Sequence, residues 1–218
     1  MFKELASYRA LALGALLIWC GAVSGQEAST MVPPPALDDS TAPAKAQKAV
    51  LAGGCYWGTQ GIFEHVNGIK RVVAGFTGGR SDSDGGVESV MITFDPKVIS
   101  YGQLLRIFFS VVHDPTQLNR QGPDVGASYR SDVFYLSDEQ RRVAEAYIAQ
   151  LGDAKVFPAK IVTRVDAFSK FQQADINQQD FMIKNPHSDY IIVNDRPKLA
   201  SLKRLFPAAY KEYPVEFH

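Results

Sequence analysis

The stretch KAVLAGGCYWG, residues 48–58, decides the fold of this chain. Residues 48–52 form a short apolar run, which predicts a buried strand. Gly53 and Gly54 permit a sharp turn after it, because glycine adopts backbone conformations that other residues avoid. From Thr59 to Val66, Ile62, Phe63 and Val66 fall on one side of a helix. Cys55 is therefore predicted to lie at a strand-to-helix turn.

The position of Cys55 makes it a candidate nucleophile. A thiolate at a helix N-terminus gains from the helix dipole and from free backbone N–H groups, so we expect its pKa to be lowered. Tyr56 and Trp57 follow directly, and two aromatic rings beside a thiol can form an apolar cup for a small group such as a methyl. The alternative is that both rings are core residues and that the cysteine is buried and inert.

Two strand-like segments follow, and the second carries a candidate acid. Residues 69–77 are β-branched and apolar, and residues 87–94 alternate. Within the second segment, Glu88 shares parity with Val90, Ile92 and Phe94, so it is predicted to face an apolar environment. Such an environment raises the pKa of a carboxyl group, which could then give up a proton near neutral pH. The alternative is a glutamate at a strand end that reaches solvent.

The remaining periodic segments complete the fold prediction. Ser100 and Ser137 each precede a glutamine by three residues, which indicates capping boxes that start two helices. Further strands are predicted over 131–136 and 160–165, and a short helix over 199–206. Alternating strands and helices favour an α/β (α+β) two-layer sandwich, for which we expect a ferredoxin-like core.

The N-terminal residues have the pattern of a targeting segment. Residues 1–25 combine Lys3 and Arg9 with an apolar run and small residues before Gln26, which is typical of a signal peptide cleaved after Gly25. We therefore expect an exported, periplasmic protein, with an uncleaved membrane anchor as the alternative. Residues 26–46 are rich in Pro, Ala, Ser and Thr and are predicted to be a flexible linker, leaving 47–218 as the catalytic domain.

Composition excludes several classes of partner and ligand. The chain has 218 residues, of which 46% are hydrophobic and 21% charged, with 23 basic and 23 acidic side chains. This balance does not indicate a nucleic-acid partner. Cys20 would leave with the signal peptide, so the mature chain keeps Cys55 alone and has no close pair of histidines. We therefore predict no metal site and no bound cofactor.

Several blocks of this sequence resemble those of the A-type peptide methionine sulfoxide reductases. The blocks are GCYWG at 54–58, AGFTGG at 74–79, FDP at 94–96, HDPTQ at 113–117 and QGPDVGASYRS at 121–131. They occur in the family's order, and the resemblance covers about residues 48–210. The family reduces the S epimer of methionine sulfoxide, free or in proteins, and reverses methionine oxidation.

The resemblance implies a role for each matching residue. Cys55 would attack the sulfoxide sulfur and become a sulfenic acid, while Tyr56 and Trp57 hold the substrate methyl. Glu88 would protonate the sulfoxide oxygen, Tyr129 would hydrogen-bond it, and Asp124 would support the site. Oxidised proteins or free methionine sulfoxide are the implied substrates, and we expect the protein to act as a monomer.

The sequence departs from the family pattern at three places. Residues 80–87 form a shorter stretch than usual and lack a Tyr that helps to bind the oxygen, and Gly85-Gly86-Val87 stands for Gly-His-Ala. Farther along, Asn177-Gln178 replaces a Tyr-His pair. No resolving cysteine follows Cys55, so an external thiol, from a thioredoxin-like protein or a small molecule, is predicted to clear the sulfenic acid.

Two other functions are compatible with parts of the sequence. The shortened stretch could belong to a catalytically weak relative that serves as a binding module for oxidised or Met-rich segments. Alternatively, Cys55 and His113 could form the nucleophile and base of a Cys-His hydrolase, although His113 at a helix end before Asp114-Pro115 is more typical of a structural cap.

Overall fold

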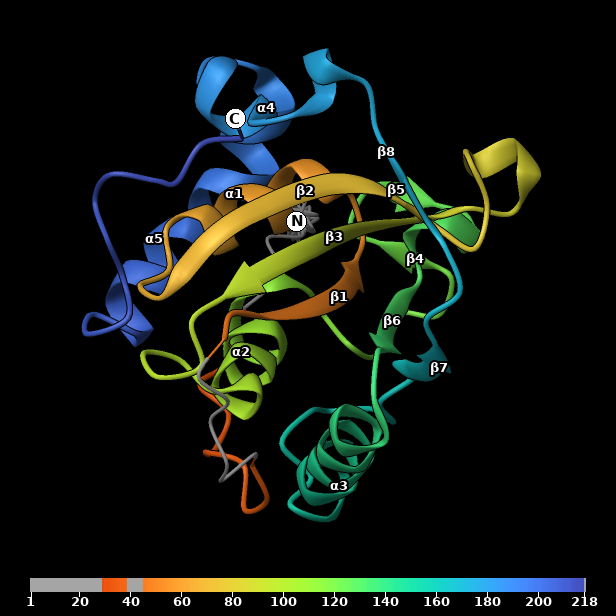
Figure 1. Ribbon diagram of the computed structural model, residues 1–218, viewed down its shortest axis with the longest axis vertical. Helices are drawn as coiled ribbons and strands as arrows, with labels where there is room; N and C mark the ends of the chain where they lie inside the picture. Colours follow the sequence, from red (N-terminus) through yellow and green to blue (C-terminus); the bar gives the residue numbers. More distant parts are fainter. Residues whose placement is uncertain (1–28, 39–44, 218) are drawn as a thin grey trace, which may run out of the picture.

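The computed structural model describes residues 29–38 and 45–217, and the predicted signal peptide lies outside these residues. One curled sheet organises the domain (Figure 1). Its six strands have the order β7-β6-β1-β3-β2-β8, and β4 pairs with β5 separately. All neighbours in the large sheet are antiparallel except β6 and β7. The chain is thus a mixed α/β protein, as predicted.

The elements have the following bounds. The strands of the large sheet are β1 (Gln47–Gly53), β2 (Ile69–Thr77), β3 (Val87–Phe94), β6 (Ser131–Tyr135), β7 (Arg164–Ala167) and β8 (Phe171–Gln173), and the small pair is β4 (Arg120–Gln121) with β5 (Asp124–Val125). The α-helices are α1 (Tyr56–Glu64), α2 (Tyr101–Ile107), α3 (Asp138–Asp153), α4 (Phe181–Lys184) and α5 (Arg196–Leu205).

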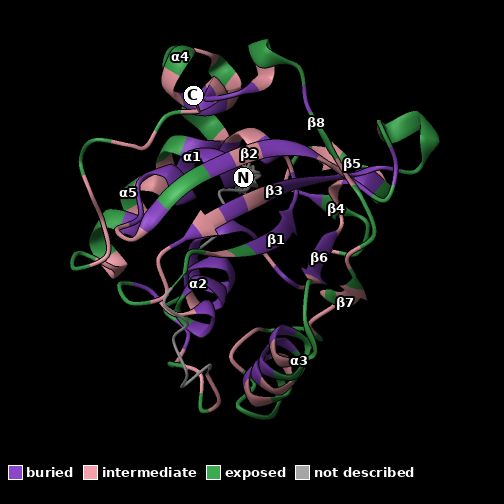
Figure 2. Ribbon diagram, viewed as in Figure 1, coloured by how far each residue is buried: buried purple, intermediate pink, exposed green. Residues whose placement is uncertain are grey.

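The hydrophobic core lies between the helices and one face of the sheet. Alternate residues of β1 and β3, such as Leu51, Val90 and Ile92, join Phe63 of α1 and Leu104 of α2 in one buried cluster. The opposite face of the sheet carries a small hydrophobic cluster of four buried side chains, namely Val50, Ala52, Val87 and Phe134. The elements at the centre of the fold are accordingly buried almost throughout (Figure 2). Helices on one face of a sheet are the expected consequence of strands that alternate apolar and polar residues.

The strongly patterned elements agree with the sequence predictions. The bounds of β2 and β3 are those predicted. The predicted capping box is complete at Ser100, whereas at Ser137 only the bond from the Gln140 N–H to Ser137 Oγ forms and Gln140 Oε1 accepts from the Leu136 N–H. The strand predicted over 160–165 lies farther along the chain in the structure, as β7 (Arg164–Ala167). The helix predicted over 199–206 begins earlier, at Arg196, with Pro197 in its first turn, where proline's missing N–H costs nothing.

The C-terminal segment from β8 to Phe217 consists of short helical elements joined by turns and loops, and side-chain amides hold its first part in place. The buried Gln179 accepts hydrogen bonds from Gln60 Nε2 and the Ala74 backbone N–H. Its own amide donates to the carbonyls of Ala74 and Ala174. A buried amide that satisfies both its donor and acceptor groups fixes the backbone around it. This segment therefore forms a rigid wall against α1 and β2.

Part of the region predicted as a flexible linker packs on the domain. Val32 is fully buried, and its N–H donates to Ser110 Oγ at 3.2 Å. Tyr147 Oη donates to the Pro33 carbonyl and Gln150 Nε2 to that of Pro34. Residues 30–37 thus differ from the linker expected over 26–46, because their carbonyl groups find donors on α3. None of the helices within 29–38 and 45–217 has the length and apolar character needed to cross a bilayer.

Candidate active site

Cys55 occupies the N-cap of α1, at the predicted strand-to-helix turn. Gly54 turns the chain there with a φ of +86°, and a Cβ on it would lie 2.5 Å from the side chain of Gln121. Both observations require glycine, since φ in this range and such a close approach exclude other residues. The turn leaves the Cys55 side chain half-buried and presents it to a groove.

The pKa of Cys55 is raised, so the predicted lowering is wrong. Burial is the main cause, followed by the negative charges of Glu88 and Asp195. The backbone N–H of Trp57 donates a hydrogen bond to the sulfur and lowers the pKa, as expected at a helix N-terminus, but this effect is smaller. Desolvation and two carboxylates outweigh one N–H group and the dipole of a short helix. The resting side chain is a protonated thiol.

Glu88 lies next to the thiol, on the helix-facing side of β3, as its parity predicted. Its side chain is 7% exposed, and its Oε2 accepts a hydrogen bond from the Tyr56 N–H at 2.9 Å. Burial raises its pKa to about 7, with a smaller contribution from the charge of Asp82. Asp82 belongs to a 3₁₀ turn, Asp82–Asp84, within the shortened stretch 80–87. Cys55 and this carboxyl group each affect the other's pKa, so a proton donor lies close to the thiol.

The two aromatic residues after Cys55 have different surroundings. The Tyr56 ring is buried and meets Phe76 edge-on, with 5.6 Å between the ring centroids. The Trp57 ring is half-buried and stacks on Phe181, with a centroid separation of 3.7 Å and an interplanar angle of 9°. Its Nε1 donates to Gln178 Oε1 at 3.0 Å, so a residue that departs from the family pattern orients the indole. Stacking and a hydrogen bond together fix the ring next to the thiol.

The loop predicted to cover the site brings Asp124 and Tyr129 to it. The charges of Glu88 and Asp124 contribute, after burial, to raising the pKa of Tyr129 to about 12, so its hydroxyl stays a donor. Asp124 accepts a hydrogen bond from Tyr190 Oη. The sequence analysis missed Tyr190, which lies in the helical turns that lead into α5, because no apolar periodicity marks residues 189–195. Its aromatic ring also meets Trp57 edge-on, with 5.6 Å between centroids.

Asp195 is a second residue that the sequence analysis missed. It is 1% exposed, and a Cβ on Gly58 would lie 2.2 Å from its Oδ1. The carboxyl group therefore packs against the first turn of α1, where the positive end of the helix dipole favours an anion. The signal that could have found it is Gly58 itself, since a glycine inside a short helix indicates a close approach by another group.

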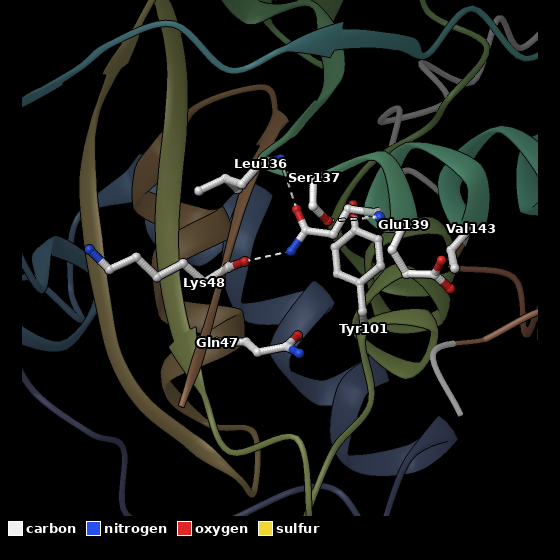
Figure 3. A pocket seen from close by; sticks show the side chains of 8 residues that line it. Gln47, Lys48, Tyr101, Leu136, Ser137, Glu139 and Val143 are labelled. Atoms are coloured by element: carbon white, nitrogen blue, oxygen red, sulfur yellow. Dashed lines mark hydrogen bonds between the residues drawn. The ribbon is translucent and has the colours of Figure 1, made fainter. Parts of the chain in front are cut away.

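A groove of about 730 Å³ opens at Cys55 between two segments of the chain. Its walls are the loop around β4 and β5 and the segment from Tyr190 to Lys198. A separate, smaller pocket of about 220 Å³ lies where α3 begins (Figure 3). It is lined by Tyr101, Ser137 and neighbouring residues but by none of the predicted site residues, so it is not a candidate active site.

His113 is not placed to act as a base. Its Nε2 lies 2.7 Å from Ser131 Oγ and its Nδ1 3.3 Å from the Phe108 carbonyl oxygen, so both ring nitrogens are engaged away from Cys55. Burial lowers its pKa to about 3. Within residues 29–38 and 45–217, no group of three or more His, Cys, Asp and Glu side chains is arranged to hold a metal ion.

Comparison with known proteins decides the family. A family model described as peptide methionine sulfoxide reductase matches residues 47–209. The chain is 48% identical to peptide methionine sulfoxide reductase MsrA 2 of Mesorhizobium japonicum, over 82% of this chain and 96% of that protein. The chain belongs to the A-type peptide methionine sulfoxide reductase family. It is accordingly an oxidoreductase that reduces methionine sulfoxide.

Further relatives and solved structures agree with this assignment. MsrA of Chromobacterium violaceum is 43% identical over 73% of this chain and 96% of that protein. The crystal structure of Mxr1 from Saccharomyces cerevisiae in reduced form matches with a TM-score of 0.60 and 30% identity, covering 67% of this chain and 89% of that one. Methionine sulfoxide reductase A of Corynebacterium diphtheriae has the same fold, with a TM-score of 0.54 and 24% identity over 74% and 86% of the two chains.

Proposed function

We propose that this reductase uses Cys55 as its single catalytic thiol and Glu88 as its general acid, acting on the S epimer of methionine sulfoxide. One observation carries the proposal: the Glu88 carboxyl group accepts a hydrogen bond from the N–H of the residue after Cys55, so it lies close enough to the thiol for each to affect the other's pKa, and the Glu88 pKa is about 7. At neutral pH this carboxyl group is protonated in a large fraction of molecules. A proton and a sulfur nucleophile are therefore available at the same place.

The proposed chemical step needs no thiolate in the resting enzyme. As the Cys55 sulfur attacks the sulfoxide sulfur, Glu88 gives its proton to the sulfoxide oxygen and takes up the thiol proton. The oxygen, now carrying the proton from Glu88, then moves from the substrate sulfur to the Cys55 sulfur while the transient sulfur–sulfur bond breaks, so methionine leaves and Cys55 becomes a sulfenic acid. The thiol is oxidised and the sulfoxide is reduced by the same two electrons. A raised Cys55 pKa is compatible with this sequence, because the proton moves only when the substrate oxygen is there to accept one.

The other site residues bind and orient the substrate in this proposal. The half-buried Trp57 ring and the Tyr56 ring form the cup for the substrate methyl. Tyr129, which remains protonated, donates a hydrogen bond to the oxygen as negative charge develops on it. Asp124 orients the Tyr190 hydroxyl at the edge of the site. The alternative of a binding module has no observation in its favour.

We also propose that the enzyme is recycled by an external thiol. Cys55 is the only cysteine between residues 26 and 218. The sulfenic acid must then be reduced by a thiol that comes from outside, from a thioredoxin-like protein or a small molecule. No cofactor has a role in this sequence of steps.

The remaining proposals concern the chain as a whole. The order β6-β1-β3-β2 supports a ferredoxin-like core, because β1 and β2 run parallel with β3 between them. The composition of residues 1–25 supports export to the periplasm, with cleavage after Gly25 or retention as a membrane anchor. We propose that the mature enzyme, residues 47–218 with any preceding segment, acts as a monomer on oxidised proteins or free methionine sulfoxide.

One assay tests the proposed function. Purified protein is given each epimer of a methionine sulfoxide peptide with dithiothreitol, and methionine formation is followed. We expect turnover of the S epimer only, and a fall of at least about 10³-fold in Cys55→Ser, since removing a nucleophile removes the covalent step. Equal rates in Cys55→Ser and the wild type would contradict the proposal.

A further inference from the structure

The Trp57 indole is held by two kinds of contact. Phe181 stacks on its face and Tyr190 meets it edge-on, with 3.7 Å and 5.6 Å between the ring centroids. These contacts set the plane of the indole ring. Its Nε1 donates a hydrogen bond to Gln178 Oε1 at 3.0 Å, and this bond sets how the ring is turned within that plane. Gln178 therefore decides which edge of the ring faces the substrate methyl in the cup.

The Gln178 side chain is fixed by its neighbours in the chain. Gln178 ends the 3₁₀ turn Ile176–Gln178, and its N–H donates to the Asp175 carbonyl at 2.9 Å. The next residue, Gln179, is fully buried in its network of hydrogen bonds. Gln178 Nε2 donates to Asn177 Oδ1 at 3.3 Å. Because the amide nitrogen is engaged there, the amide oxygen is the end that faces the indole N–H.

An amide oxygen accepts this hydrogen bond at every pH. Gln178 stands where the family pattern has a histidine. A neutral imidazole can accept from an indole N–H through its unprotonated nitrogen, but a protonated imidazole has only donors. With an ordinary pKa of about 6.5, a histidine side chain at this position would lose its acceptor as the solution becomes acidic. The glutamine removes that dependence on pH.

The proposed chemistry makes acidic solution the favourable range. Burial raises the pKa of Glu88 to about 7, so this carboxyl group is protonated in about half of the molecules at pH 7 and in nearly all of them at pH 5. In the proposed mechanism only the protonated form gives its proton to the sulfoxide oxygen. The substrate must therefore bind well at the same acidic pH at which a histidine would have released the Trp57 indole.

We propose that Gln178 is a positioning residue, whose amide oxygen holds the Trp57 indole against the substrate methyl equally well in neutral and in acidic solution. The inference rests on the proposed function, in which Trp57 forms one side of the cup. Gln178 acts through Trp57 and not on the substrate itself. This side of the cup then keeps its shape over the whole range in which the acid becomes fully protonated.

The titratable and charged groups around the indole come from each element packed against it. They are Cys55 and Tyr56 at α1, Glu88 of β3, Asp124 of β5, Asp175 before the 176–178 turn, Asp180 and Lys184 at α4, and Tyr190 and Asp195 in the turns before α5. Burial raises the pKa of the two tyrosines and of the thiol, so all three stay protonated between pH 5 and pH 8. The titration of Glu88 occurs whatever residue stands at 178. Comparing two variants at one pH therefore isolates the contribution of residue 178.

Substrate binding without turnover tests this role. The full chain carries Cys55→Ser, so that a peptide with one methionine S-sulfoxide binds but is not reduced, and calorimetry gives its dissociation constant at pH 8 and at pH 5. Gln178→His is compared with this parent at each pH. We expect the two dissociation constants to agree within about twofold at pH 8. At pH 5 binding by the Gln178→His variant should be about three- to tenfold weaker than by the parent, in keeping with the loss of one hydrogen bond.

Two controls make the result specific to the indole. Gln173→His places a histidine at an exposed position of β8, opposite Gly75, and should follow the parent at both pH values. Trp57→Phe keeps an aromatic ring but has no N–H, so adding Gln178→His to it should cause no further weakening at pH 5. A ratio of dissociation constants that is the same at both pH values for Gln178→His would overturn the inference. The same weakening at pH 5 in Gln173→His, or in the Trp57→Phe background, would also overturn it.

Failure of the proposed chemistry would have a different signature. The wild type would then form no methionine, whereas the dissociation constants would still follow the pattern expected for Gln178, because binding needs no reaction at Cys55. Absence of peptide binding by the parent at both pH values would overturn the cup and the inference together.

Discussion

The active site has two walls that are built by different means. The first wall consists of β1, β3 and the start of α1, and it carries Cys55 and Glu88, the proposed nucleophile and acid. The second wall is the segment 174–195, a series of short helical turns that carries Gln178, Phe181 and Tyr190. Backbone ladders hold the first wall, whereas buried side-chain amides and aromatic stacking hold the second. The comparison teaches that the strands and α1 position the proposed reacting groups, while the segment of short helical turns sets how the surrounding side chains are oriented.

Removing the acid of the first wall should have the largest effect. Glu88→Gln keeps the size of the side chain but cannot give up a proton, so we expect kcat for methionine release to fall about 10²- to 10⁴-fold. In the proposed mechanism, activity requires protonated Glu88, so the rate should fall as the pH rises above about 7, the Glu88 pKa. This limb of the pH profile should be missing in Glu88→Gln. A variant that retains both the rate and the limb would show that another group supplies the proton.

The aromatic stack of the second wall should matter less. Phe181→Ala removes the ring that stacks on Trp57, and we expect kcat/KM to fall about tenfold, which corresponds to about 1.4 kcal/mol of lost binding. The loss should be mainly in KM, because Phe181 touches the cup and not the reacting atoms. Phe168→Ala, a half-buried phenylalanine packed on the opposite face of the sheet, is the control for general destabilisation. Equal losses in both variants would mean that the stack has no specific role.

These two walls also differ in how well the sequence predicts them. The alternation of residues 87–94 and the glycines before Cys55 predicted the strands, the turn and the placement of Glu88, because those patterns reflect local backbone preferences. The second wall depends on Gln179 meeting Gln60, which are 119 residues apart in the chain. No periodicity marks such a contact. The wrong direction for the Cys55 pKa has the same origin, since it depends on the burial of the thiol and the approach of Asp195.

The hydroxyl group of Tyr190 links the second wall to the β4–β5 loop. Tyr190→Phe removes the hydrogen bond to Asp124 but keeps the ring against Trp57, so we expect kcat/KM to fall about three- to tenfold, in keeping with the loss of one hydrogen bond to a charged group. Michaelis–Menten kinetics with a methionine sulfoxide peptide measure the change. Tyr213→Phe removes a hydroxyl from a tyrosine that is 86% exposed and should leave kcat/KM unchanged. A larger loss in Tyr190→Phe than in Phe181→Ala would reverse the proposed order of importance within this wall.

Glu64 should affect the stability of the second wall and not the chemistry of the first. It is fully buried on α1, and burial, followed by the nearby Asp180 carboxyl group before α4, raises its pKa to about 9. Its pKa in the unfolded chain is about 4.3. The stability it contributes is fully present below that value and is lost as the pH rises through about 9, with a slope of at most about 1.4 kcal/mol per pH unit.

Glu64→Gln removes this titration, since its amide stays neutral at every pH. Urea denaturation at pH 5 and pH 8 should show a smaller loss of stability in this variant than in the wild type, while kcat at pH 7 stays the same. Glu145→Gln, at an exposed position on α3, should follow the wild type. Parallel pH dependence in all three proteins would mean that the carboxyl group of Glu64 is not protonated in the folded state. The second wall would then be held to α1 by the Gln60–Gln179 hydrogen bonds without help from a neutral carboxyl group.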